Sequence, residues 1–175
     1  ALNLTGSAVV FITAAAEDIP DLYDDNRGVG QAYTLATGSD AVAIGYSTLA
    51  SGDSSIAAGH TADATGAGSN ALGYSAQAVG AFSTAIGRAY SSGSGSFAAN
   101  IDTNSSSYGA QNTDAIAIGK NAKATLANSV AIGTNALSET AGLMALGGST
   151  TTVQISGTYT LPTTDGTNGQ VLTTD

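Results

Sequence analysis

The pattern of hydrophobic and polar residues in this chain repeats every fourteen positions. A short phrase of alternating small and bulky residues ends in glycine in each copy, as in Ser129-Val-Ala-Ile-Gly133. The glycines that close the seven clear copies are Gly45, Gly59, Gly73, Gly87, Gly119, Gly133 and Gly147. A fixed period of this length indicates stacked copies of one structural unit rather than a single globular core.

Two columns of the repeat predict a strand that is apolar on both faces. The residue two places before each glycine is always alanine, whereas the residue directly before it is Ile, Leu or, once, Ala. Side chains alternate between the two faces of a strand, so these columns point in opposite directions. The bulky side carries Val42, Ile44, Ile56, Leu72, Ile86, Ile116, Ile118, Val130, Ile132, Met144 and Leu146. A strand of this kind is expected to be buried on both faces.

The second half of each unit predicts another strand, with one small-residue face and one polar face. Ala62 and Ala64 alternate with Thr61 and Asp63, and later units repeat this order. Two short strands per fourteen residues, joined by turns at the glycines, form one coil of a flattened parallel β-solenoid with about eight coils. We expect an interior so narrow that only Ala and Ser fit.

The bulky column therefore needs a different partner, and the simplest one is another copy of the chain. Burying one Ile or Leu stabilises by about 1.5–3 kcal/mol. A ridge of such residues along the whole solenoid exceeds the apolar patches that soluble monomers expose. Closed rotational symmetry would cover it, with each copy packing its bulky column on a common axis. We expect an obligate oligomer with the bulky side chains named above at its interface.

Three regions follow from the limits of the repeat. Residues 1–30 precede it and contain a predicted short strand and an acidic loop. Residues 31–150 form the repeat domain, with an irregular insertion near 93–112, where the spacing between glycines exceeds two units by four residues. Residues 151–175 form a C-terminal β segment that we expect to lead into further chain. Alternation from Val153 to Leu161 predicts a strand there.

The acidic loop offers a candidate metal site. Asp21, Asp24 and Asp25 are spaced closely enough to supply oxygen ligands to Ca²⁺. The full EF-hand pattern is absent, so a solvated turn is the simpler interpretation. We expect no metal and no other cofactor.

A third column, directly after the glycine, gathers most of the few cations with two tyrosines. Its members are Tyr46, His60, Tyr74, Arg88 and, beyond the irregular coil, Lys120. Stacked coils place equivalent residues about 4.8 Å apart, so we expect a continuous ladder that points outward at the turn. Tyr and Arg commonly anchor binding surfaces. The ladder is therefore a candidate site for an anionic glycan, the alternative being that it only stiffens the turn.

Composition and charge exclude several functions. With a net charge of −9 and only four Lys and Arg in 175 residues, the chain has no basic patch for nucleic acid. No apolar run reaches the ~18 residues that span a bilayer. His60 is the only histidine and the Asp residues of the repeats are scattered, so no converging acid and base are evident and we do not expect an enzyme.

The phrase Ser129-Val-Ala-Ile-Gly133 and its copies resemble the head repeats of trimeric autotransporter adhesins of the YadA type. The resemblance covers about residues 38–92 and 112–149, although Asn70, Thr84 and the coil near Asn100 depart from the pattern. It implies an all-β fold, a left-handed parallel β-roll of 14-residue coils assembled as a homotrimer. It also implies a non-catalytic extracellular fibre that attaches to a surface receptor, a glycan or the extracellular matrix.

The stretch from Ile155 to Asp175 resembles segments of bacteriophage fibre proteins. The alternative is therefore that the chain belongs to a phage tail fibre with the same repeats, acting in host recognition or as a structural shaft. A fibre enzyme that degrades surface polysaccharide is a further alternative. The expected location is extracellular, on a bacterial cell surface or on a virion fibre.

Overall fold

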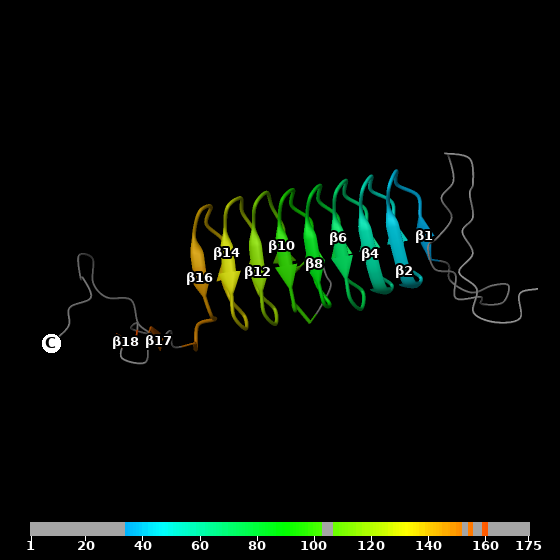
Figure 1. Ribbon diagram of the computed structural model, residues 1–175. Coiled ribbons are helices and arrows are strands. Elements are labelled where there is room, and N and C mark those ends of the chain that lie inside the picture. The colour runs from blue at the N-terminus through cyan, green and yellow to red at the C-terminus, as the bar shows by residue number, and fades with distance from the viewer. Residues whose placement is uncertain (1–33, 103–106, 152–153, 156–158, 161–175) are drawn as a thin grey trace, which may run out of the picture.

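The computed structural model describes residues 34–102 and 107–151, together with the backbone of residues 154–155 and 159–160. Residues 34–151 wind as a flattened β-solenoid made of two long parallel sheets (Figure 1). Each sheet contains eight strands, and each coil contributes one strand to each sheet. The predicted all-β parallel solenoid of about eight coils is confirmed.

The two sheets differ in the length of their strands. The long-strand sheet contains β2 (Val42–Tyr46), β4 (Ile56–His60), β6 (Asn70–Leu72), β8 (Thr84–Ile86), β10 (Phe97–Ala99), β12 (Ile116–Ile118), β14 (Val130–Ile132) and β16 (Met144–Leu146). The short-strand sheet contains β1 (Leu35–Ala36), β3 (Leu49–Ala50), β5 (Asp63–Ala64), β7 (Gln77–Ala78), β9 (Tyr90–Ser91), β11 (Gly109–Ala110), β13 (Lys123–Ala124) and β15 (Leu137–Ser138).

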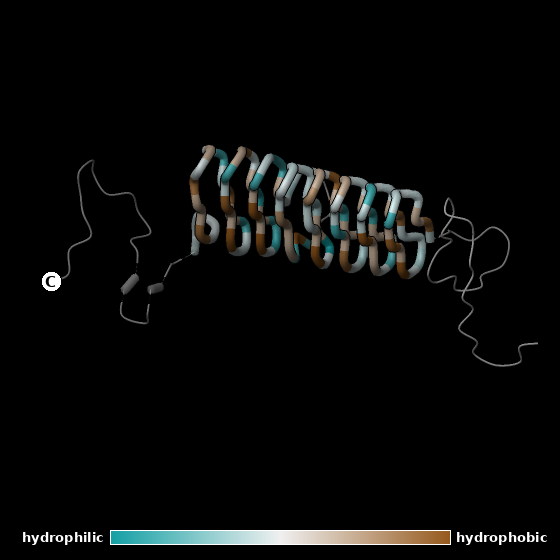
Figure 2. Tube along the Cα trace, turned by 45° about the horizontal axis from the view of Figure 1, so that its top comes forward, coloured by the Kyte–Doolittle hydropathy of each residue, from teal (hydrophilic) through white to brown (hydrophobic). Residues whose placement is uncertain are grey.

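Residue pairing within the sheets follows the repeat. Ala57 of β4 lies opposite Ala43 of β2 on one side and Ala71 of β6 on the other. Backbone hydrogen bonds connect each coil to the next, as where the Ile56 amide donates to the Ser69 carbonyl at 2.9 Å. Equivalent residues therefore form straight columns along the solenoid, and Figure 2 shows hydrophobic residues recurring at the same place in successive coils.

Alanine fills most of the interior between the two sheets. Ala57 from a long strand and Ala64 from a short strand have no exposed surface. Some buried serines satisfy their hydroxyl groups locally: the Ser91 and Ser96 hydroxyls lie 2.7 Å apart, and Ser96 Oγ also donates to the Gly93 carbonyl at 2.6 Å. The buried hydroxyls of Thr48, Ser55 and Ser69 have no hydrogen-bond partner within the described residues. Small side chains let the two sheets approach closely, which is why bulky residues of the long strands face outward.

The coil that contains β10 departs from the predicted interior of Ala and Ser. Ile101 occupies a position of the ladder column, yet its side chain is fully buried and is the largest one buried in the described residues. Tyr108 packs against the same core. The prediction of an interior restricted to Ala and Ser is wrong here, because this coil is longer than its neighbours and can enclose a larger side chain.

The irregular region combines one shortened coil with one lengthened coil. Gln77 pairs with Tyr90, thirteen residues further along, whereas Phe97 pairs with Ile116, nineteen residues further along. The net excess of four residues in the sequence thus comes from the loss of one residue and the gain of five. The gain falls between Asp102, which precedes the insertion, and the paired strand β11.

Two columns of left-handed backbone conformation turn the chain at the ends of the long strands. One column follows the glycine by two residues and has φ values from 51° to 57° at Ser47, Thr61, Ser75, Asn121 and Asn135. Asn121 Nδ2 donates to Asn135 Oδ1 at 3.1 Å along this column. The other column precedes the glycine by five residues. Short polar residues and glycine tolerate this conformation best, which explains most of the residues in both columns.

The C-terminal segment forms a small hairpin. β17 (Gln154–Ile155) pairs with β18 (Tyr159–Thr160) in antiparallel fashion. The single strand predicted from Val153 to Leu161 is therefore wrong. Alternation of apolar and polar residues continues through a tight hairpin as it does along one strand, and Gly157, a residue that favours turns, stands between the two strands in the sequence.

Candidate binding surfaces

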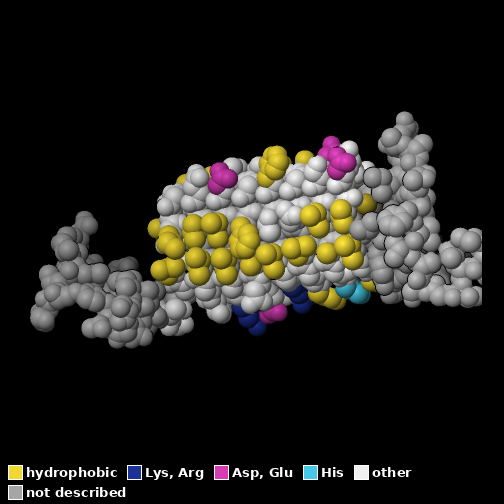
Figure 3. Space-filling model, in the orientation of Figure 1, with side chains coloured by type: hydrophobic (Ala, Val, Ile, Leu, Met, Phe, Trp, Pro, Cys, Tyr) yellow, Lys and Arg dark blue, Asp and Glu magenta, His cyan; other side chains and the backbone are white. Residues whose placement is uncertain are grey.

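The bulky side chains of the long strands lie together on one broad face, which we call the apolar face. Figure 3 shows it as a field of hydrophobic side chains along the solenoid. In the single chain these side chains reach solvent, with exposed fractions of 41% for both Ile44 and Ile86. The predicted interface residues all belong to these strands: Val42, Ile44, Ile56, Leu72, Ile86, Ile116, Ile118, Val130, Ile132, Met144 and Leu146.

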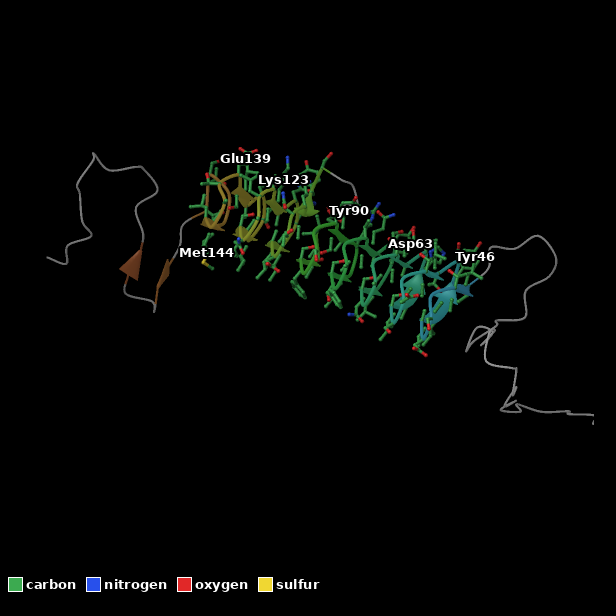
Figure 4. All side chains as sticks on the ribbon, turned by 90° about the horizontal axis from the view of Figure 1, so that it is seen from above. Tyr46, Asp63, Tyr90, Lys123, Glu139 and Met144 are labelled. Atoms are coloured by element: carbon green, nitrogen blue, oxygen red, sulfur yellow. The ribbon has the colours of Figure 1, made fainter. Side chains whose placement is uncertain are left out.

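The short-strand sheet presents a mixed surface on the opposite side of the solenoid. Figure 4 looks along the sheets and places Tyr90 and Lys123 on the side away from Met144. Asp63 lies in the same sheet, in register with Gln77. Burial raises the pKa of the Asp63 carboxyl above its usual value, and a hydrogen bond with Gln77 lowers it in part. Charged, aromatic and apolar side chains thus alternate on this side.

The structure brings four of the five predicted ladder residues together at one turn. The rings of Tyr46 and His60 stack with centroids 4.7 Å apart and planes 25° apart. His60 and Tyr74 stack in the same way, at 5.1 Å and 15°. The guanidinium carbon of Arg88 lies 6.0 Å from the centroid of the Tyr74 ring. These residues follow one another in successive coils, as the fourteen-residue spacing predicted.

Lys120 lies apart from this stack. The intervening coil places the buried Ile101, rather than a polar residue, in the same column. Lys120 Nζ forms an ion pair with a carboxylate oxygen of Asp102 at 3.0 Å, and both side chains are more than half exposed. An exposed pair of this kind contributes less than about 1 kcal/mol. The predicted ladder is therefore an aromatic and cationic stack with one separate cation beyond it.

The stacking limits what the ladder can bind. Both faces of His60 are covered by tyrosine rings, and Tyr74 is covered by His60 and approached by Arg88 on its other side. What remains accessible is the row of ring edges, hydroxyl groups and N–H donors. Such a row favours hydrogen-bond acceptors and carboxylates over a sugar ring, which would need a free aromatic face.

The opposite edge of the apolar face carries residues that sequence reasoning passed over. Asp40, Asp53, Phe82 and Asp114 lie at the turn before the long strands and are exposed. Phe82 is 72% exposed and has a φ of 58°, a conformation that is rare for a bulky residue. The sequence contained a signal, because three of these residues stand five places before the glycine position. Because the Asp residues form no acid and base pair in the sequence, the repeat alone did not predict a shared surface for them.

In the described part of the chain, no three His, Cys, Asp or Glu side chains lie close enough together to hold a metal ion. The calcium candidates Asp21, Asp24 and Asp25 lie outside the described residues, so that site stays a prediction. Within residues 34–102 and 107–151 and the two C-terminal strands, no helix has the length and apolar character needed to cross a membrane.

Stacked two-stranded coils with an alanine interior and one long apolar face define a repeat protein of the parallel β-solenoid class. Residues 36–62, 64–89 and 110–136 match the family model described as the YadA head domain repeat. These three segments of the solenoid are therefore YadA-type head repeats, similar to those of trimeric autotransporter adhesins. Such repeats fit a structural adhesin rather than an enzyme.

No curated protein matches the chain. The three matched segments include the first four clear copies of the repeat and the two that close at Gly119 and Gly133 after the insertion. The stretch from Ile155 to Asp175, which carries the resemblance to phage fibres, lies mostly outside the described residues, and that resemblance stays a prediction.

Proposed function

We propose that this chain is a segment of a trimeric, non-catalytic extracellular fibre that attaches a bacterial surface to a receptor, a glycan or the extracellular matrix. The observation that carries the proposal is the apolar face, which runs the length of a solenoid built of YadA-type head repeats. Adhesins with such repeats are exposed on bacterial surfaces, which supports an extracellular location.

In the proposed assembly three copies pack their apolar faces on a common axis. Each chain winds as a left-handed roll, and both this handedness and the number three are those of adhesins with the same repeats. Covering one Ile or Leu stabilises by about 1.5–3 kcal/mol. The full face therefore outweighs the roughly 4–15 kcal/mol that association costs in lost translational and rotational freedom.

The short-strand sheet is the surface that such a trimer leaves outside. Tyr90 and Lys123 point outward from it, and Asp63 adds a carboxylate in the same sheet. A partner that contacts this side meets three equivalent copies, so weak individual contacts would be strengthened by avidity. The exposed outer side suits attachment to a repetitive partner such as a polysaccharide or a matrix fibre.

The size of the protein in solution tests the assembly. Light scattering should give three chains per particle, and the thermal midpoint should rise with protein concentration, because only the folded chains associate. A folded monomer with a concentration-independent midpoint would show that the apolar face is not an interface between copies.

Arrays of glycans and matrix proteins test the attachment. We expect the trimer to be retained on at least one class of ligand, while a reducing-sugar assay on surface polysaccharides shows no release of ends. Release of sugar would make the chain an enzyme. A trimer that is retained on no ligand would be a passive spacer, and the adhesive part of the proposal would be wrong.

A further inference from the structure

Two edges of opposite character border the apolar face. The ladder edge, defined by Tyr46, His60, Tyr74, Arg88 and Lys120, lies where the long strands end. The acidic edge, defined by Asp40, Asp53, Phe82 and Asp114, lies at the turn before those strands begin. Figure 3 shows Lys, Arg and His side chains along one border of the apolar face, where Asp102 pairs with Lys120, and Asp or Glu side chains along the other border.

The residues of the two edges correspond coil by coil. Every coil passes from the acidic edge through one long strand to the ladder edge, so each coil contributes to both. The coil of β4 carries Asp53 and His60, the coil of β8 carries Phe82 and Arg88, and the coil of β12 carries Asp114 and Lys120. In the coil of β6 the protruding Tyr74 corresponds to Gly68, which has no side chain.

The acidic-edge side chains lean toward the preceding coil. Asp53 Oδ1 accepts a hydrogen bond from the Ser39 amide at 3.0 Å. A Cβ added to Gly68 would lie 2.7 Å from Cδ1 of Phe82, so the Phe82 ring covers Gly68. The Asp114 carboxylate covers Gly95 in the same way.

The ladder-edge side chains lean in the same direction. The Arg88 guanidinium lies over Tyr74, which belongs to the preceding coil. Lys120 Nζ reaches Asp102, also one coil back. The side chains of both edges are thus displaced by one coil in the same direction. The tips of two side chains from the same coil therefore still lie at the same height on the two edges.

A cyclic trimer brings these two edges together. When three flat faces surround a common axis, each contact between neighbours is heterologous: one edge of a copy meets the opposite edge of the next. The axis runs along the solenoid, so equal coils meet at equal height. We infer that the ladder edge of each copy docks on the acidic edge of the next, pairing Arg88 with Phe82 and Lys120 with Asp114. This inference rests on the proposed trimer.

A second copy of this chain fits against these edges, because the chemistry of each pair of edge residues is complementary. A carboxylate faces His60 or Lys120, and an aromatic ring faces Arg88, a residue that binds aromatic faces well. Docking also accounts for Phe82, whose exposed ring in a left-handed backbone is otherwise unexplained. Such outliers persist where a function requires them. The stacked rings of the ladder leave ring edges and hydrogen-bond donors accessible, and these donors fit the carboxylates of the acidic edge.

Cysteine cross-linking tests the edge contact, since the chain has no natural cysteine. In one chain, Asp114 and Lys120 are six positions apart along a stretch that includes β12, roughly 20 Å of extended backbone. A disulfide needs Cα atoms within about 7 Å, so Asp114→Cys with Lys120→Cys can only link neighbouring copies. On oxidation we expect a covalent trimer in a non-reducing denaturing gel. The control pair, Asp114→Cys with His60→Cys, lies four coils apart and should give no such band.

The outcomes separate this inference from the proposed function. A wild-type trimer in light scattering whose Asp114/Lys120 cysteine pair cross-links no better than the control would overturn the edge contact and leave the trimer standing. A monomeric wild-type protein would overturn both.

Arg88→Ser provides a second test of the same contact. Losing three contacts of about 0.5–1 kcal/mol each should lower the association constant of the trimer by at least about tenfold. If Arg88→Ser abolishes attachment and leaves the association constant unchanged, the ladder is a receptor site and not a contact between copies.

Discussion

At the scale of single residues, the fold depends on positions where no side chain can be present. The glycines at the turn before the long strands lie directly under the next coil. A Cβ added to Gly66 would meet the Gly80 carbonyl oxygen at 2.1 Å, and Gly52 and Gly80 are equally crowded by the coils that follow them. Coil spacing is set by backbone hydrogen bonds, so the stack cannot widen locally without losing them.

Gly66→Ala should therefore destabilise the solenoid strongly. The methyl group has to displace backbone atoms of the next coil, which we expect to cost about 3 kcal/mol or more per chain, at the upper end of overpacking effects. Urea unfolding followed by circular dichroism measures this. Gly142→Ala is the matched control, because its φ is +72° and no atom lies within 4 Å of an added Cβ. It should cost only about 1 kcal/mol of backbone strain. Equal losses for the two variants would contradict the argument from crowding.

Asp63 predicts a weak dependence of stability on pH. Burial raises the pKa of Asp63 in the folded chain, so the folded state holds this proton more tightly than the unfolded state. The stabilisation is present below the unfolded pKa and is lost as the pH rises through the folded pKa. Asp63→Asn should raise the free energy of unfolding at about pH 7 by less than about 0.5 kcal/mol, because this side chain is only partly buried, and it should reduce the difference in stability between about pH 3 and pH 7. Glu139→Gln, at an exposed position, serves as the control and should leave that difference unchanged.

Residue columns made much of the site predictable from the sequence. The alternation of Ala with Ile or Leu predicted which side chains are buried, and the spacing of about 4.8 Å expected for the ladder compares with the observed 4.7 Å and 5.1 Å between ring centroids. Ile101 was missed because its column is otherwise exposed. Whether the ladder rings stack face to face depends on side-chain rotamers, which a repeat period does not determine.

At the scale of elements, the coils tolerate unequal length as long as their strands keep register. The spacing between glycines showed the net excess of four residues but not its division into a loss of one and a gain of five. Only strand pairing separates the loss from the gain, because the spacing between two glycines gives the net difference alone. The shortened coil turns through Gly87, whose φ of 74° is lower than the 112° to 141° of Gly45, Gly59, Gly119 and Gly133. Gly87 thus takes over the left-handed turn from the missing residue.

Deleting residues 103–107 should leave the solenoid intact. The deletion returns that coil to fourteen residues and removes no paired strand, since β11 begins at Gly109. Shortening a connection between strands lowers the entropy cost of closing it slightly, so we expect a free energy of unfolding within about 1 kcal/mol of the parent protein. The matched control removes five residues, 129–133, which include all of β14, and should abolish cooperative unfolding. Loss of folding on deleting 103–107 would mean that the insertion packs as part of the core.

At the scale of the whole molecule, the sequence predicted the apolar face but not the relation between its two edges. The apolar face was predictable because its residues repeat in type as well as position. Its two edges were not recognised as a pair, because their residues share a position but differ in chemistry: Phe82 stands in the same column as Asp114, and Arg88 in the same column as Tyr74. Complementarity between columns becomes visible only when each coil is followed from one edge to the other.

A charge placed on each side of the solenoid distinguishes the apolar face from the outer side. Ile132→Asp puts a carboxylate on β14 at the proposed axis, where three copies would bury it unpaired at a cost of several kcal/mol each. We expect light scattering to show monomers. Leu137→Asp introduces the same group on the neighbouring strand β15, where the side chain is 48% exposed on the other side of the solenoid. This variant should remain a trimer of nearly unchanged stability. If both variants stay trimeric, or both dissociate, the apolar face is not the surface on which the copies meet.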